Sequence, residues 1–260
     1  MQNELNVIGI QADLVWENPT ENLAFFESKI NTLSKGIDLV VLPEMFTSGF
    51  TMNPEKVAEK MDGNAISWMQ KMASENEIAI CGSLIIEENE NYYNRLVFVH
   101  PSQKIETYDK RHSFTLAGED KVYTSGSKKL IVTYKGWKIC PLVCYDLRFP
   151  VWARNTENYD LLIFMANWPV TRIKAWETLL KARAIENMSY VIGVNRTGKD
   201  ANDYKYSGNS LVVDYFGQEI SNLQNNEVGI VKATLVKTEQ DRIRKKLGFL
   251  NDKDSFKIEF

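Results

Sequence analysis

Two short apolar runs constrain the fold more than any other feature of the chain. They are Ile37–Pro43 (IDLVVLP) and Asp160–Ala166 (DLLIFMA). Runs of this length without polar alternation are typical of strands that are buried on both faces. Segments with helical spacing of apolar residues follow them or lie between them, as in Thr20–Lys35 and Thr171–Asn187. This alternation predicts an α/β (α+β) layered sandwich, in which helices cover the sheets.

The spacing of apolar residues also predicts the remaining helices and strands. Thr20 is the expected cap of the first helix, and Gly36 its expected end. Further helices are expected at Asn64–Asn76 and Pro150–Thr156, and a hairpin at Tyr92–His100 with Lys104–Tyr108. The remaining expected strands are Leu5–Ala12, Ile78–Ile86, Lys129–Tyr134, Trp137–Val143, Tyr190–Asn195, Ser210–Asp214 and Val228–Leu235.

The sequence contains no segment that would separate two domains. No Pro/Gly-rich linker, low-complexity tract or strong repeat divides the sequence. We therefore expect residues 1–260 to form a single domain, since this length is ample for one core. The charged segment from about residue 236 is expected to be a tail that packs at an oligomer interface.

Composition excludes several classes of protein. Hydrophobic residues make up 44% and charged residues 25%, as in ordinary globular chains, and the net charge of −3 favours neither nucleic acid nor an anionic membrane. There is no run of about 18 apolar residues, which a spanning helix would need, and Met1–Asn6 lacks the basic start of a signal peptide. Three cysteines, an odd number, predict reduced thiols and a cytoplasmic location.

The histidine count narrows the chemistry. With two histidines, the chain is a poor candidate for a histidine-rich metal site. We therefore expect acid–base chemistry to come from carboxylates and lysine.

Cys144 is the first residue that could carry such chemistry. It ends an apolar strand and enters a turn, Tyr145–Pro150, where backbone N–H groups can bind a developing oxyanion. Arg148 adds positive charge nearby, and Asp146 could pair with it. A buried structural cysteine is the alternative reading. Cys81 and Cys140 lie inside apolar strands, so both are expected to be core residues.

Two further positions complete a candidate site. Glu44 ends the run Ile37–Pro43, where desolvation would raise its pKa, although a solvated strand-end acid remains possible. Lys110 follows an expected strand and could stabilise an oxyanion, or simply be solvated. His112, close to Lys110, leaves a Cys–His arrangement open.

Taken together, three segments resemble the nitrilase (carbon–nitrogen hydrolase) superfamily, whose catalytic residues are Glu, Lys and Cys in that order. The resemblance runs from about Asn6 to about Ala233. The matching segments are Leu42-Pro43-Glu44-Met45-Phe46, Tyr108-Asp109-Lys110-Arg111-His112 and Leu142-Val143-Cys144-Tyr145-Asp146-Leu147-Arg148-Phe149-Pro150.

The resemblance implies a four-layer α-β-β-α sandwich, usually dimerised, and a mechanism without metal or cofactor. Glu44 would be the general base, Cys144 the nucleophile, and Lys110 with the backbone N–H of Tyr145 the oxyanion-binding groups. Glu119 matches a second active-site glutamate that orients lysine, substrate or water. A homodimer or larger homo-oligomer is expected, with a small amide as the only other partner.

Within the superfamily the chain is most similar to bacterial ω-amidases, which act on 2-oxoglutaramate and 2-oxosuccinamate. The likeness lies in Cys144–Pro150 (CYDLRFP), Ala166–Pro169 (ANWP) and Ala182–Asn187 (ARAIEN). Such a substrate needs a cation for its carboxylate, and Arg172 at an expected helix start is a candidate. The expected lining residues of a small apolar pocket are Trp168, Trp176 and Phe114.

Other functions stay open at this point. N-carbamoyl amine hydrolases and aliphatic amidases or nitrilases use the same three residues, so the triad alone does not separate them. A non-catalytic module that uses the fold for binding is a further alternative.

Overall fold

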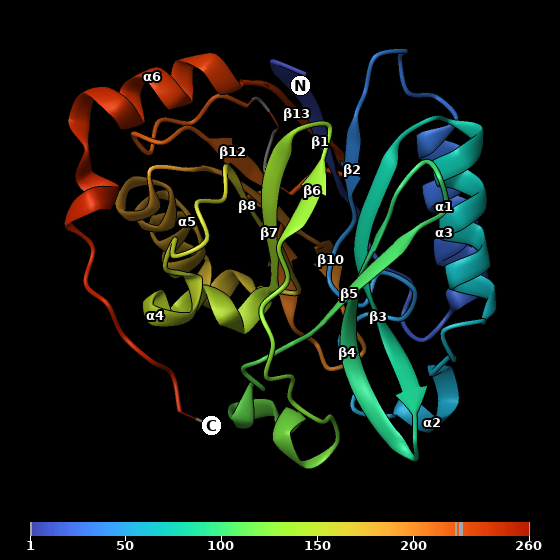
Figure 1. Ribbon diagram of the computed structural model, residues 1–260. Coiled ribbons are helices and arrows are strands. Elements are labelled where there is room, and N and C mark those ends of the chain that lie inside the picture. The colour runs from blue at the N-terminus through green and yellow to red at the C-terminus, as the bar shows by residue number, and fades with distance from the viewer. Residues whose placement is uncertain (1, 222, 224–225, 260) are drawn as a thin grey trace.

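The computed structural model describes residues 2–221, 223 and 226–259. Two sheets face each other and helices cover their outer faces, so the molecule has four layers (Figure 1). The predicted α-β-β-α sandwich is therefore confirmed.

The first sheet has six strands in the order β13-β1-β2-β3-β4-β5. Their bounds are β13 Gly229–Val236, β1 Glu4–Gln11, β2 Leu39–Val41, β3 Ala79–Glu88, β4 Asn91–Val99 and β5 Ile105–Asp109. Its outer face is covered by α1 and α3, and the bounds of its helices are α1 Pro19–Ile30, α2 Pro54–Val57 and α3 Asn64–Glu75.

The second sheet has five strands in the order β12-β9-β8-β7-β6. Their bounds are β12 Leu211–Val213, β9 Tyr190–Asn195, β8 Leu161–Ala166, β7 Trp137–Val143 and β6 Val132–Tyr134. The helices on this side are α4 Pro150–Ala153, α5 Ile173–Asn187 and α6 Lys237–Leu247, and β10 Thr197–Lys199 pairs with β11 Lys205–Ser207 in a separate hairpin. Short 3₁₀ turns are η1 Thr115–Ala117, η2 Glu119–Lys121, η3 Cys144–Arg148, η4 Val170–Arg172 and η5 Phe249–Asp252.

Strand β2 shows why its run of residues is apolar throughout. Leu39 and Val41 belong to the core between the two sheets. Val40, which points the other way, packs with Phe26 and Met69 of the helices α1 and α3. A strand covered on both faces needs apolar residues at every position.

The first helix differs from its expected bounds at both ends. The cap is Asn18, whose side chain accepts the Glu21 N–H at 3.2 Å, and Pro19 takes the first helical position, so Thr20 lies inside the helix. The helix ends at Ile30, and the Thr32 hydroxyl donates to the Lys29 carbonyl in its last turn. The expected end at Gly36 is therefore wrong.

The charged C-terminal segment forms the helix α6. Gln240 is fully buried and donates from Nε2 to the carbonyl oxygen of Asp160 at 2.9 Å. Arg244 donates to the Asp160 carboxylate at 2.9 Å. The helix thus packs on its own chain, and its role at an oligomer interface remains a prediction.

Among the helices of the described residues, none is both long enough and apolar enough to span a membrane.

Candidate active site

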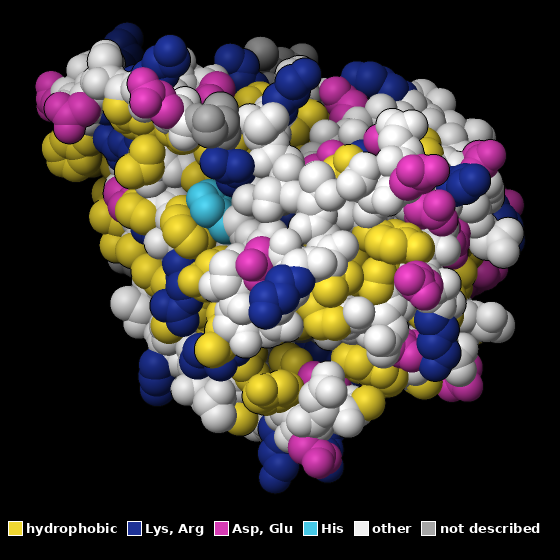
Figure 2. Space-filling model, turned by 90° about the horizontal axis from the view of Figure 1, so that it is seen from below, with side chains coloured by type: hydrophobic (Ala, Val, Ile, Leu, Met, Phe, Trp, Pro, Cys, Tyr) yellow, Lys and Arg dark blue, Asp and Glu magenta, His cyan; other side chains and the backbone are white. Residues whose placement is uncertain are grey.

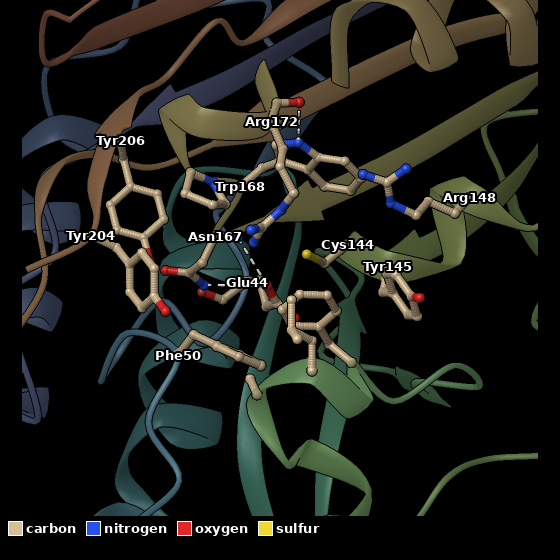
Figure 3. A pocket seen from close by; sticks show the side chains of 14 residues that line it. Glu44, Phe50, Cys144, Tyr145, Arg148, Asn167, Trp168, Arg172, Tyr204 and Tyr206 are labelled. Carbon is tan, nitrogen blue, oxygen red and sulfur yellow. Dashed lines mark hydrogen bonds between the residues drawn. The ribbon is translucent and has the colours of Figure 1, made fainter. Parts of the chain in front are cut away.

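The three residues of the predicted triad follow strand ends on one side of the sandwich. Glu44 lies just beyond β2, Lys110 follows β5, and Cys144 follows β7. Cys144 has a φ of +45°, so the chain turns sharply there as β7 passes into η3. This backbone turn aims its thiol into the pocket between the two sheets (Figure 3).

Glu44 is the centre of the buried polar contacts. Its Oε1 accepts a hydrogen bond from Lys110 Nζ at 2.9 Å and from Asn94 Nδ2 at 2.8 Å. Its Oε2 accepts the backbone N–H of Asn167 at 2.9 Å. The Cys144 thiol also interacts with this carboxylate. One carboxylate therefore touches both the candidate nucleophile and the candidate oxyanion cation.

Glu119 holds Lys110 from the other side. Both of its carboxylate oxygens lie 2.9 Å from Lys110 Nζ, and Oε2 also accepts the Phe114 N–H. Lys110 is 3% exposed and Glu119 1%. The lysine is therefore fixed between two carboxylates, with little freedom to swing away.

The pKa of Glu44 is opposite in direction to the sequence expectation. Burial alone would raise it, as predicted, but the Lys110 ammonium and hydrogen bonds from Lys110, Asn167 and Cys144 hold the pKa below its ordinary value. The carboxylate is thus ionised at neutral pH. The sequence-based expectation was wrong because it took no account of a cation in contact with Glu44.

The pKa values of Glu119, Lys110 and Cys144 also differ from their ordinary values. Burial raises the pKa of Glu119, and the nearby charge of Glu44 adds to this against the opposing effect of Lys110. Burial would lower the pKa of Lys110, but Glu119 and Glu44 raise it, so the ammonium keeps its proton. Shielding from bulk water and the charge of Glu44 raise the pKa of Cys144, which rests as a thiol.

A small pocket of about 90 Å³ opens above Cys144. A volume of this size suits a short molecule. Arg148 lies over the ring of Trp168, with Cζ 4.9 Å from the ring centroid, and Arg172 lies over Phe114 at 5.1 Å (Figure 3). The pocket lining comprises Glu44, Phe50, Phe114, Leu116, Ala117, Cys144, Tyr145, Arg148, Asn167, Trp168, Pro169, Arg172, Tyr204 and Tyr206.

The surroundings of the pocket combine apolar and basic character. The face seen from below carries hydrophobic side chains beside Lys and Arg side chains, with hollows between them (Figure 2). Two guanidinium groups at one small pocket favour an anionic ligand.

Four of the five predicted substrate-binding residues line this pocket, and Trp176 does not. Trp176 is fully buried behind Trp168, with ring centroids 5.6 Å apart, and donates from Nε1 to the Asn209 carbonyl at 2.9 Å. It supports the pocket wall from the core. The amphipathic helix pattern does not distinguish a pocket residue from the core residue behind it.

The structure also bears on two pairings near Cys144 that the sequence left open, Asp146 with Arg148 and Cys144 with His112. Asp146 does not pair with Arg148, because its carboxylate contacts Tyr108, His112 and the Val143 N–H. The His112 ring lies 2.8 Å from Asp146 through Nδ1 and stacks on Phe149. The base that interacts with Cys144 is Glu44.

The sequence reading did not identify the asparagines around Glu44. Asn94 and Asn167 donate to its carboxylate, and Asn195 accepts the Trp168 N–H at 2.7 Å. Asn167 and Asn195 each lie at the end of a buried strand, a position that could have indicated them.

The described part of the chain contains no group of three His, Cys, Asp or Glu side chains placed to hold a metal ion. At this site Cys144 supplies a thiol, Glu44 and Glu119 supply two carboxylates, and Lys110 supplies an ammonium group.

Several known proteins are similar to this chain. Residues 7–244 match the carbon-nitrogen hydrolase family. The omega-amidase YafV of Escherichia coli K12 is 39% identical over 254 residues, covering 98% of each chain. The 2-oxoglutaramate amidase of Bacillus subtilis is 34% identical over 248 residues, covering 94% of this chain and 95% of that protein. The structure of XC1258 from Xanthomonas campestris, a CN-hydrolase superfamily protein with an arsenic adduct in the active site, gives a TM-score of 0.95 at 38% identity and covers 99% of this chain and 100% of that one.

Proposed function

The chain belongs to the carbon-nitrogen hydrolase family and is an amidohydrolase, and we propose that it cleaves the terminal amide of short 2-oxo acid ω-amides through a thioester on Cys144. The substrates proposed are 2-oxoglutaramate and 2-oxosuccinamate, and the products are the dicarboxylic 2-oxo acid and ammonia. The observation that carries this proposal is the contact of the Glu44 carboxylate with both the Cys144 thiol and the Lys110 ammonium group.

The first half of the reaction forms the thioester. Glu44 accepts the thiol proton as Cys144 Sγ attacks the amide carbon, and the carbonyl oxygen becomes an oxyanion. Lys110 and the backbone N–H of Tyr145 stabilise that oxyanion; this N–H lies in the first turn of η3, where backbone donors have no partner within the helix. The C–N bond then breaks, and Glu44 returns its proton to the departing ammonia.

The second half releases the acid. Glu44 accepts a proton from water, and the resulting hydroxide adds to the thioester carbon. The C–S bond breaks and the thiolate regains the proton from Glu44. Glu119 acts through Lys110, which it holds in place by two contacts of 2.9 Å.

The substrate class follows from the pocket and from the relatives. Arg172 supplies a planar guanidinium for the substrate carboxylate, and its place over Phe114 restricts its motion. Trp168, Phe114 and Tyr145 line a space that is too small for a long chain. Two relatives that match nearly the full chain are named for ω-amide hydrolysis.

The assembly and location proposed are a homodimer or larger homo-oligomer in the cytoplasm. Apolar side chains exposed on or near the second sheet's helices support association; they are Val151, Ile185 and Phe216. The three cysteines are free thiols, which suits a reducing compartment. Light scattering of the purified protein tests the assembly: a dimer mass or above supports it, and a monomer at micromolar concentration contradicts it.

A substrate panel tests the reaction. Purified protein is incubated with 2-oxoglutaramate, a neutral aliphatic amide, an aliphatic nitrile and an N-carbamoyl amine, and ammonia, carbon dioxide and carboxylate are measured. We expect ammonia from 2-oxoglutaramate at the highest kcat/KM, without carbon dioxide. Preference for the N-carbamoyl compound or the nitrile would overturn the substrate assignment, and no turnover of any member would favour a binding module.

A further inference from the structure

Asp146 lies two residues after Cys144, and nothing in the proposed reaction uses it. The side chain is fully buried, although the site's substrate pocket is close by. Its Oδ2 accepts the Tyr108 hydroxyl at 2.7 Å and the Val143 N–H at 3.0 Å. Its Oδ1 lies 3.1 Å from the His112 backbone N and 2.8 Å from His112 Nδ1.

These contacts join the two segments that carry the reacting groups. Val143 directly precedes Cys144, so one oxygen of Asp146 fixes the residue from which the thiol-bearing turn departs. Tyr108 and His112 stand two residues before and two residues after Lys110. The carboxylate therefore binds both flanks of the lysine segment and the start of the cysteine turn.

In its hydrogen bonds with the Tyr108 hydroxyl and the two backbone N–H groups, the Asp146 carboxylate is the acceptor. The Tyr108 oxygen already accepts the Arg111 N–H and the Trp152 Nε1–H, both at 3.0 Å, so its own proton must point to Asp146. The backbone N–H groups of Val143 and His112 can only donate. All of these donors require an acceptor at position 146. A carboxylate has two acceptor oxygens, whereas the amide of an asparagine has only one.

An aromatic stack extends the same connection to the pocket wall. The His112 ring lies parallel to Phe149, with centroids 3.6 Å apart, and Phe149 packs edge-on against Tyr145 at 5.1 Å. Tyr145 in turn meets Phe114 at 5.0 Å. Through this stack the lysine segment also connects to Tyr145, whose backbone N–H is proposed to bind the oxyanion.

We propose that Asp146 is a positioning residue that holds the Lys110 segment in register with the Cys144 turn, and so sets where the ammonium lies relative to the thiol. This inference rests on the proposed function of Lys110 and Cys144. Because catalysis depends strongly on the alignment of reacting groups, the loss of such a tie is expected to lower kcat rather than substrate binding.

The test compares Asp146→Asn with a matched control, Asp160→Asn. Asp160 is also buried and also accepts several donors, from Lys138, Lys237 and Arg244, but it lies under α6, away from the pocket. Rates are expressed per Cys144 that iodoacetamide can titrate, and the melting temperature is measured for each variant. Both variants are expected to melt at a lower temperature than the parent protein.

For Asp146→Asn we expect kcat for 2-oxoglutaramate to fall by about 100-fold, the scale of a misplaced reacting group. KM should stay within about threefold, because Arg172 and Trp168 make no hydrogen bond to Asp146. Asp160→Asn should keep the parent kcat. Equal kcat losses in the two variants, or a KM change that accounts for the effect, would overturn the inference.

Two further measurements keep the inference testable if a variant or a substrate fails. The rate of Cys144 alkylation by iodoacetamide needs no substrate, and it should slow in Asp146→Asn but not in Asp160→Asn even if no amide is hydrolysed. If Asp146→Asn does not fold, Tyr108→Phe removes one donor and should slow alkylation and kcat in the same direction. Parent rates in Tyr108→Phe would then overturn the inference.

Discussion

Lys110 Nζ lies 2.9 Å from Glu44 Oε1, and both side chains are buried at the end of the two facing sheets. A buried carboxylate without a cation would take up a proton. The ammonium keeps Glu44 ionised while the same carboxylate contacts the Cys144 thiol. Glu44, the proposed base, is thus an ionised carboxylate, and Cys144, the proposed nucleophile, is a thiol, as proton transfer between them requires.

This ion pair predicts the pH dependence of the reaction. The pKa of Glu44 lies below its ordinary value of 4.5, so kcat/KM should persist as the pH falls and decline only below that value. The folded state favours the charged form of Glu44. The contribution of this carboxylate to folding stability is therefore also lost as the pH falls through its lowered pKa. Rates measured from pH 3.5 to 8 in low-salt buffer check this.

Removing the Lys110 ammonium group should reverse the shift in the pKa of Glu44. In Lys110→Gln the burial of Glu44 is no longer opposed, so the acidic limb of any residual activity should move to higher pH. Activity should drop by roughly 100- to 1000-fold, as for loss of an oxyanion donor. An unchanged acidic limb would contradict the proposed coupling.

Thiol reactivity should separate the three cysteines. Burial raises the pKa of Cys140 to about 12 and raises that of Cys81 further, and neither has a base in contact. Cys144 also has a raised pKa, but Glu44 accepts its proton and the pocket admits a reagent. Iodoacetamide at pH 7 should therefore modify Cys144 alone and abolish ammonia release, as peptide mapping can show.

The control for this experiment is the unfolded chain, in which all three thiols should react at similar rates in urea. Comparable labelling of Cys81 or Cys140 in the folded protein would contradict the account.

Arg172 should matter for charged substrates and not for neutral ones. A charge-assisted hydrogen bond contributes about 1.5–3 kcal/mol, so Arg172→Leu should lower kcat/KM for 2-oxoglutaramate by roughly 10- to 100-fold. Hydrolysis of a neutral short amide should change much less. Arg148→Leu is the matched control, since Arg148 also lies over an aromatic ring of the pocket. A larger effect at Arg148 would move the carboxylate site to that residue.

Trp176 should affect stability and leave substrate binding intact. The side chain is fully buried, and truncating such a residue to alanine costs about 3–5 kcal/mol. Urea denaturation of Trp176→Phe, a milder change, should show a smaller loss with KM near that of the parent protein. A large KM increase at parent stability would contradict the placement of Trp176 behind Trp168.

Local sequence signals predicted most of the fold and the three central residues. The strand Trp137–Val143 and the turn after it were visible as an apolar run followed by polar residues, and Cys144 stands where they meet. Resemblance to a family supplied what spacing alone did not, namely the prediction that Glu44, Lys110 and Cys144 act together.

The errors came from interactions between distant segments. The pKa direction of Glu44 depends on Lys110, which is 66 residues away in sequence. The partner of Asp146 is Tyr108, not the nearby Arg148. The sequence predicts that Trp176 lines the pocket, because only the tertiary packing shows that Trp168 stands in front of it.

The covalent intermediate tests the central claim most directly. The protein is mixed with excess 2-oxoglutaramate, quenched in acid during turnover, and analysed by mass spectrometry of its peptides. The account predicts a 2-oxoglutaryl thioester on the peptide that contains Cys144, with neither the adduct nor ammonia release in Cys144→Ala. An adduct on another residue, or ammonia release by Cys144→Ala at the parent rate, would contradict it.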